Sequence, residues 1–400
     1  MSEVQVPVFM YHSVGIPDPE WKWNYLTTPV QDFENQIKWL KKCGFNTIHF
    51  DQYYDYIFNG GALPKNPVIL TFDDGYVDNY IFAYPIMKKY GFVGTVYINS
   101  DFIDPRGIKR PVFEGGKLPE AKNCRGFLSP LEMKELEETN VLRMESHAKT
   151  HTWYPVSGKI IDFRHPNDRH DWMTWNDYPE KKPFLQVDDE SLVKYGAPVF
   201  ENEKSLIASK FQPAVDLTPH LQVFVKGNGG TEFFNSPDWK QKLEAQTIQL
   251  NGTLVVAGKN ETDEEHYQRI KEELEHSKTE LQNIIGRDVI MLCWPGGSGS
   301  AEGEKAVKEL DYLISTTARD LSAAQRKALR NIPTQKSSRV ARISPVTYHD
   351  NVADFGSKIV YSSGPIMVLK TLIFKNWLGA RIWGNGILFL LQRFYRIALK

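Results

Sequence analysis

The chain has 400 residues and a net charge of −1, which gives no electrostatic reason to expect nucleic acid as a partner. Hydrophobic residues make up 41% of it and charged residues 24%, as in soluble proteins with a buried core. Three widely spaced cysteines exclude a disulfide framework and a zinc knuckle, and they fit a reducing compartment. The N-terminus lacks the basic and apolar segments of a secretory signal, so we expect a cytoplasmic protein.

Apolar runs and helical patterns alternate along the first part of the chain. Strands are expected at 6–11, 46–50, 68–72, 91–98 and 141–145, and helices at 29–43, 50–58, 79–90 and 129–140. Pro85 lies inside the third of these helices, which must start or kink there. The alternation predicts an α/β fold with a parallel sheet, either a barrel or a doubly wound sheet.

Two adjacent carboxylates, Asp73 and Asp74, follow the apolar strand at 68–72. Burying both costs several kcal/mol unless a cation or hydrogen-bond donors compensate them. Gly75 gives the backbone freedom for a turn that brings both carboxylates to one cleft. The alternative is an ordinary strand-end turn with two solvated aspartates.

A pair of histidines, His147 and His151, follows the expected strand at 141–145. Their i, i+4 spacing predicts that both imidazoles lie on one face of a helical turn, at the same end of the sheet as the aspartates. Two imidazoles and one carboxylate with open positions form the ligand set of a hydrolytic zinc or related divalent centre. An unmetallated chance pair is the alternative.

Two segments now carry a family resemblance. Thr-Phe-Asp-Asp-Gly at 71–75 and Ser-His-Ala-Lys-Thr-His at 146–151 resemble the first two motifs of the polysaccharide deacetylases, carbohydrate esterase family four with the nodulation-deacetylase homology domain. The resemblance implies an α/β fold that is a distorted (β/α)7 barrel, with Asp73 as catalytic base and Asp74, His147 and His151 as metal ligands. The implied cofactor is a divalent metal: Zn²⁺ first, with Co²⁺, Ni²⁺, Mn²⁺ or Fe²⁺ as alternatives.

The opening segment Pro-Val-Phe-Met-Tyr-His-Ser-Val at 7–14 resembles the branch that deacetylates exported poly-N-acetylglucosamine. The barrel of that branch is circularly permuted, so its general-acid histidine comes first in the chain. The resemblance therefore implies that His12 protonates the leaving amine. A structural role for His12, with His349 as the acid, is the alternative.

The third family motif corresponds to Trp294, Pro295 and Gly296, after an expected strand at 289–293. The family's arginine, which holds the catalytic base, is missing from this motif, and Gly296 stands where an aromatic residue is usual. The backbone N–H of Gly296 can still serve an oxyanion site. Tyr76, directly after the Asp-Asp-Gly turn, is also expected to take part in substrate binding. Trp294 either lines the sugar groove or is buried at the strand end.

The chain is expected to divide into the first part of the barrel (1–152), an insertion over the active-site mouth (153–260), the second part of the barrel (261–350) and a C-terminal helical extension (351–400). Thr262, Glu265 and Gly286 delimit a long helix in the third part. The insertion contains His165, His170 and His220, expected as surface residues, with a second metal site as the alternative.

The C-terminal extension is basic and amphipathic. From residue 355 onward it has no acidic residue; its basic residues are Lys358, Lys370, Lys375, Arg381, Arg393, Arg396 and Lys400. The segment 365–400 is therefore expected to contact the inner leaflet of a membrane. Packing on the barrel or on a dimer partner is the alternative.

Together these patterns predict a metal-dependent hydrolase that removes N-acetyl groups from an amino-sugar glycan, whether a polysaccharide, an oligosaccharide or a lipid-linked precursor. Two alternatives remain at this stage. One is a catalytically impaired glycan-binding or scaffold protein on the same fold. The other is a deformylase of a lipid-linked amino sugar.

Overall fold

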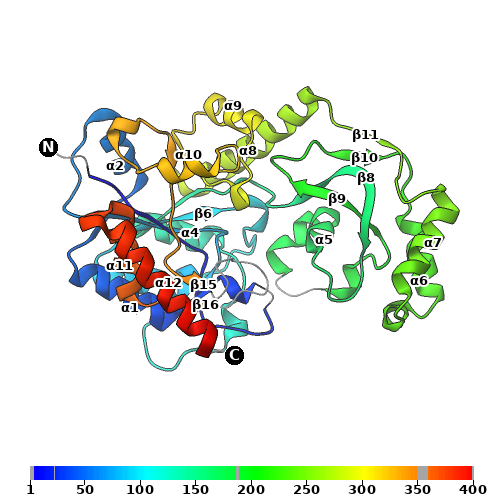
Figure 1. Cartoon of the computed structure of the whole chain (residues 1–400), viewed down its shortest axis with the longest axis horizontal. Helices are drawn as coiled ribbons and strands as arrows, with labels where there is room; N and C mark the ends of the chain where they lie inside the picture. The colour runs from blue at the N-terminus through cyan, green and yellow to red at the C-terminus, as the bar shows by residue number, and fades with distance from the viewer. Residues whose placement is uncertain (1–3, 22, 186–188, 349–358, 399–400) are drawn as a thin grey trace.

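A parallel sheet forms the centre of the computed structural model, which describes residues 4–21, 23–185, 189–348 and 359–398 (Figure 1). Its strands follow the order β1-β5-β6-β7-β12-β13-β14, and β4 pairs with the beginning of β5. Their bounds are β1 (Val8–Tyr11), β4 (Asn46–Thr47), β5 (Pro67–Phe72), β6 (Gly94–Ile98), β7 (Leu142–Ser146), β12 (Met291–Leu292), β13 (Ile314–Thr316) and β14 (Arg339–Val340).

The sheet closes into a barrel just after β14. The Ile343 N–H donates to the Val8 carbonyl at 2.8 Å, and the Ile343 carbonyl accepts from the Met10 N–H at 2.9 Å. The N-terminal strand β1 therefore lies between β5 and the last barrel segment. This arrangement confirms the predicted distorted (β/α)7 barrel and rules out the open doubly wound sheet.

The helices of the barrel agree with the predicted pattern. They are α1 (Val30–Lys42), α2 (Phe50–Tyr54), α3 (Tyr84–Tyr90), α4 (Pro130–Glu138), α8 (Asp263–Ile285), α9 (Ala301–Glu309) and α10 (Ala323–Ala328). A π-helical turn, η3 (Asn79–Ala83), runs directly into α3, and Pro85 lies in the first turn of α3, so the helix expected at 79–90 changes from π to α just before the proline. Capping boxes begin α4 at Ser129 and α8 at Thr262, as their sequences indicate.

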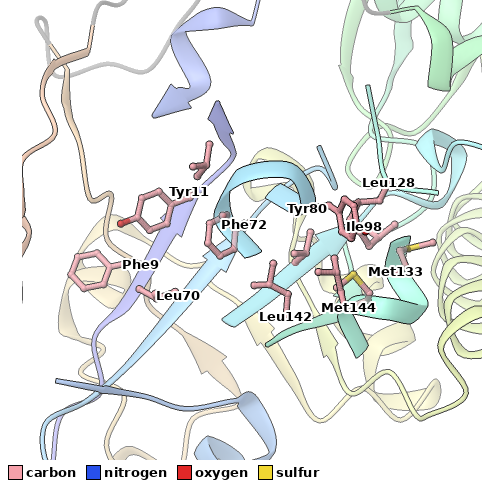
Figure 2. Close-up of a cluster of buried hydrophobic side chains, with 14 of the residues drawn as sticks. Phe9, Tyr11, Leu70, Phe72, Tyr80, Ile98, Leu128, Met133, Leu142 and Met144 are labelled. Atoms are coloured by element: carbon pink, nitrogen blue, oxygen red, sulfur yellow. The ribbon is translucent and has the colours of Figure 1, made fainter. Parts of the chain in front are cut away.

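Alternate residues of the strands build two apolar clusters, because successive side chains point to opposite faces. Inside the ring, six strands contribute Val8, Ile69, Tyr97, Met291, Ile314 and Val340. Outside it, residues such as Phe9, Leu70 and Leu142 pack beneath the covering segments, which add Tyr80 and Met133 (Figure 2). Apolar side chains therefore fill the inside of the barrel, and polar side chains can gather only at its ends.

The segment after β7 folds beside the barrel (Figure 1). An antiparallel pair, β8 (Trp153–Phe163) and β9 (Pro198–Lys204), carries α5 (Asp171–Asp177), α6 (Thr218–Gly227) and α7 (Trp239–Asn251). The smaller pairs are β2 (Ser13–Gly15) with β3 (Thr27–Pro29), β10 (Phe211–Pro213) with β11 (Gly258–Asn260), and β15 (Thr347–Tyr348) with β16 (Ile359–Tyr361). This segment has its own buried cluster around Phe163, Leu221 and Leu243. The chain ends in α11 (Gly364–Lys375) and α12 (Ala380–Ala398).

A buried ion-pair network joins β7 to the loop before β12. Arg287 donates to Glu137 at 2.8 and 2.9 Å and to Glu145 at 2.8 Å. The other Glu145 oxygen accepts the N–H groups of Ile290 and Met291 at 2.9 and 2.8 Å. Arg287 thus supplies the cation for carboxylates that the barrel buries.

The substitution Arg287→Met should lower the free energy of unfolding by about 3 kcal/mol, because it leaves the buried Glu145 and the half-buried Glu137 without their cation. Arg143→Met is the matched control: Arg143 pairs with the half-exposed Asp51, and such surface pairs contribute less than about 1 kcal/mol. Urea unfolding followed by circular dichroism measures both. Equal losses for the two variants would contradict the network's structural role.

Candidate metal centre and active site

The end of β5 delivers two carboxylates in different directions. The Asp73 N–H still donates to the Tyr11 carbonyl at 2.9 Å, as if the strand continued. Asp74 and Gly75 then adopt left-handed conformations, with φ of 72° and 76°. This turn, uncommon for a non-glycine residue, lets both carboxylates reach the same end of the barrel, as predicted.

His147 and His151 converge, but not through a helical turn. Residues 147–152 form an irregular loop after β7, in which Ala148 and His151 have φ of 59° and 43°. The two imidazole centroids lie 5.3 Å apart. The helical turn predicted from the i, i+4 spacing is therefore wrong: left-handed residues bring the rings together instead, and the spacing alone did not reveal this.

Asp74 lies between the two imidazoles. Its Oδ1 atom is 3.3 Å from His147 Nε2 and 3.6 Å from His151 Nε2. His147 Nδ1 is 2.8 Å from the Cys293 carbonyl, which can only accept, so Nδ1 carries a proton and Nε2, which has a lone pair when the ring is neutral, faces Asp74. Asp74 Oδ1 is buried and has no hydrogen-bond partner among the described residues. Lone pairs that face each other in this way require a cation or an additional proton between them.

The two imidazoles differ in their electrostatic surroundings. Burial opposes charge on His147, but the neighbouring Cys293, Asp74 and Asp73 outweigh it and raise the pKa of His147 well above its usual value. Burial lowers the pKa of His151 to about 4, with Asp74 opposing the shift. His151 is therefore neutral at pH 7 and can offer a nitrogen lone pair to a metal ion.

The other carboxylate, Asp73, faces a cation. Arg342 approaches it with both terminal nitrogens: Nη1 lies 2.5 Å from Oδ1 and Nη2 lies 2.9 Å from Oδ2. Burial acts to raise the pKa of Asp73, but Arg342, and then His12 and His147, outweigh it and hold the pKa below its usual value. Asp73 is thus an ionised carboxylate held in a fixed orientation.

Arg342 and Cys293 are site residues that the motif comparison did not find. The third motif lacks an arginine, but Arg342 reaches Asp73 from the segment that closes the barrel. A charged residue at the end of an expected buried strand was the available signal. Cys293 Sγ lies 3.7 Å from Asp73 Oδ2, and its strand position alone did not distinguish it from a core residue.

His12 follows β1 and lies next to Asp73. Its Nε2 atom is 3.9 Å from Asp73 Oδ2, beyond hydrogen-bond distance, and its side chain is 20% exposed. The histidine thus has access to solvent while it lies next to the site. The rival residue, His349, lies outside the described residues.

The third motif lies beside the site, with a different role for its tryptophan. Trp294 is 1% exposed and packs in the hydrophobic core. It therefore does not line the sugar groove; the alternative, burial at the strand end, is correct. Pro295 is also buried. Gly296 is exposed, and its carbonyl accepts from Lys204 Nζ at 2.6 Å. Gly296 has φ of 51°, a left-handed conformation that favours glycine over the usual aromatic residue.

A cavity of about 370 Å³ opens onto Asp74 and His151. Aromatic side chains from the barrel rim and from the segment after β7 line it: Trp23, Tyr25, Tyr76, Phe102, Phe127, Trp153, Trp172 and Trp175. Polar groups are contributed by Asn99, Arg169, His170, Asp171 and Asn202. The cavity has the apolar walls and few polar groups of a small-molecule site, and Tyr76 lies in it as predicted.

The other histidines of the insertion have different partners. His165 Nε2 and His170 Nε2 lie 3.8 and 3.6 Å from Asp162, but Lys240 Nζ is 2.9 Å from the same carboxylate. An ammonium group already neutralises this aspartate, so the arrangement does not favour a second metal ion.

Comparison with known proteins agrees with this geometry. Residues 60–183 match the model of the polysaccharide deacetylase family. This region of the chain is therefore similar to a polysaccharide deacetylase domain. The matched region includes both aspartates and both histidines of the site.

Two curated relatives resemble parts of this chain. YxkH of Bacillus subtilis (strain 168), whose name places it among the polysaccharide deacetylases, is 35% identical over 94 residues, 24% of this chain and 32% of its own. The poly-β-1,6-N-acetyl-D-glucosamine N-deacetylase of Staphylococcus aureus (strain MRSA252) is 31% identical over 136 residues, 34% of this chain and 40% of its own. The second likeness agrees with the branch indicated by the opening segment. The matches span less than half of either relative.

A solved de-N-acetylase structure from Aggregatibacter actinomycetemcomitans has the same fold. It superposes with a TM-score of 0.50 at 17% identity, over 85% of this chain and 94% of the other. At this identity the likeness concerns the fold alone.

Arg342→Met should lower kcat at least about a hundredfold while metal content stays unchanged, because Asp73 loses the group that orients it. Arg342→Lys should recover only part of the activity, since an ammonium cannot make the bidentate contact. Arg319→Met, at an exposed position, is the control. Steady-state kinetics with metal analysis tests this, and full activity of Arg342→Met would contradict the assignment.

Proposed function

We propose that this protein hydrolyses the N-acetyl groups of an amino-sugar glycan with a divalent metal ion held by Asp74, His147 and His151. The observation that carries the proposal is their meeting at one end of an aromatic cavity, with the fixed carboxylate of Asp73 beside them. The family match supports the reaction class, and the Staphylococcus aureus relative suggests an N-acetylglucosamine glycan.

The residues present fit a divalent metal ion. Asp74 Oδ1 is buried and unpartnered, and the two Nε2 atoms that face it belong to good zinc ligands. The Cys293 carbonyl fixes the His147 ring, as second-layer acceptors commonly do around metals. When bound there, such an ion supplies Lewis-acid activation of a water molecule and of the amide carbonyl.

Two residues of the chain each carry out one proton transfer. Asp73, ionised and held by Arg342, accepts a proton from the attacking water as the new C–O bond forms. His12 gives a proton to the amine nitrogen as the C–N bond breaks, so that acetate and a free amino sugar are released. The Gly296 N–H is the proposed oxyanion donor. Lys204 Nζ donates to the carbonyl of the same residue and so helps to hold this turn in place.

Retention of the whole constellation favours an active enzyme over an impaired glycan-binding protein. Asp73, Asp74, His147 and His151 lie within one site, and Arg342 supplies the cation that the third motif lacks. A scaffold protein has no need of a bidentate arginine on a buried carboxylate, because such a pair costs desolvation energy.

Asp73→Asn should keep its metal and lose turnover about a thousandfold, because an amide cannot accept the water's proton. His147→Ala should lose both metal and turnover. Metal content by mass spectrometry, and acetate release from N-acetylglucosamine oligosaccharides, measure the two effects. Formate release from N-formylated analogues separates the deformylase alternative. The assignment of Asp73 falls if Asp73→Asn turns over normally.

Trp153→Ala should raise KM about tenfold with little change in kcat or metal content, because Trp153 lines the cavity and its ring lies 6.1 Å from that of His151. Trp377→Ala, an exposed tryptophan outside the cavity, is the control. Oligosaccharide kinetics with both variants tests the cavity as the sugar site. An unchanged KM for Trp153→Ala would place the sugar elsewhere.

A further inference from the structure

The C-terminal helices α11 and α12 differ in how they are covered. α11 packs on the barrel helix α1: the Gly364 N–H donates to Asn35 at 2.9 Å, and a Cβ on Gly364 would lie 2.3 Å from the Trp39 ring. Met367 is fully buried, and the Tyr11 hydroxyl donates to its sulfur at 3.5 Å. α11 therefore packs on the barrel.

The next helix, α12, packs on α11 through a narrow apolar stripe. Ala380 is fully buried, and a Cβ on Gly384 would lie 2.7 Å from the Ile373 side chain and 3.2 Å from that of Leu369. The small residues on this stripe bring the two helices close together. The stripe anchors α12 and leaves its other side open.

The open side of α12 is also apolar. Ile382 is 85% exposed, Leu390 65% and Phe389 61%, and Trp383, Ile387 and Phe394 are exposed as well. Trp383, Ile387, Leu390 and Phe394 recur every three or four residues and form one continuous face, with Ile382 and Phe389 along its side. Exposed apolar faces of this extent mark interaction surfaces. In Figure 1, α12 lies on the outside of the molecule, next to α11.

The charges around this face are of one sign. Arg381 and Arg393 are the charged residues of α12 whose side chains are described, and the sequence from residue 355 onward has no acidic residue. Lys370 does not belong to this surface, because it is half-buried on α11 and donates to the Ser344 carbonyl at 2.8 Å. A symmetric contact between two copies would bring arginines together without a carboxylate on the same face.

In the described part of the chain, no helix has the length and apolar content needed to cross a bilayer. A helix that is apolar on one side, with arginines as its charged residues and a tryptophan on its apolar face, suits the interface of an anionic bilayer instead. We propose that α12 lies in the plane of an anionic membrane surface, with Ile382, Phe389 and Leu390 among the lipid chains. This inference does not depend on the proposed hydrolysis.

Flotation of the full-length protein with phosphatidylcholine vesicles containing phosphatidylglycerol tests the proposal. The wild type should float with the vesicles, and the triple variant Ile382→Ser, Phe389→Ser, Leu390→Ser should bind at least tenfold more weakly. Val223→Ser with Ile248→Ser is the matched control, because these apolar side chains are exposed on α6 and α7. All these side chains are on the surface, and thermal unfolding checks that the variants fold.

The arginines provide a second measurement. Arg393→Gln should weaken binding to anionic vesicles about fivefold and leave the weaker binding to pure phosphatidylcholine unchanged. Asp73→Asn should bind vesicles like the wild type, which separates this proposal from the proposed reaction.

Two results would overturn the proposal. One is equal vesicle binding by the wild type and the triple variant. The other is a wild-type dimer in light scattering that the triple variant converts to a monomer without any vesicle binding, because the face would then join two copies of the chain.

Discussion

The ion pair between Asp73 and Arg342 is the contact on which the site depends. Asp73 follows β5, near the beginning of the chain, and Arg342 belongs to the segment that closes the barrel beside β1. The pair therefore holds a reactive carboxylate in place only in a closed ring. Taking two charges out of water is unfavourable, and the bidentate geometry, together with the nearby His12, offsets this cost.

Around this pair, the two aspartates have separate environments. Asp73 faces a cation that the fold supplies, whereas Asp74 faces two imidazoles and has an oxygen that the protein leaves unpartnered. One carboxylate is thus neutralised internally, and the other is available to a metal ion from outside. The left-handed turn at Asp74 is the local feature that separates the two.

Much of this was predictable from sequence, and the exceptions have physical causes. The apolar strand before Asp73 and the capping boxes of α4 and α8 are local patterns, so the barrel and its helices agreed with prediction. The loop that carries His147 and His151 differed from prediction, because a spacing of four residues does not define the backbone angles between them. Arg342 was missed because its partner lies hundreds of residues away. Trp294 was ambiguous, since an aromatic side chain suits both a core and a sugar groove, and only the packing of its neighbours decides.

The hydrogen bonds between β1 and Ile343 have a consequence for how the protein is made. During synthesis β1 leaves the ribosome well before Ile343, so its second neighbour exists only after Ile343 has been added. Until then one edge of β1 has unpaired backbone groups, an exposed template for association with other chains. Barrel closure must therefore be a late, long-range folding step, and such steps are slow because distant segments have to meet. A strand of only four residues, Val8–Tyr11, limits the length of edge exposed during that interval.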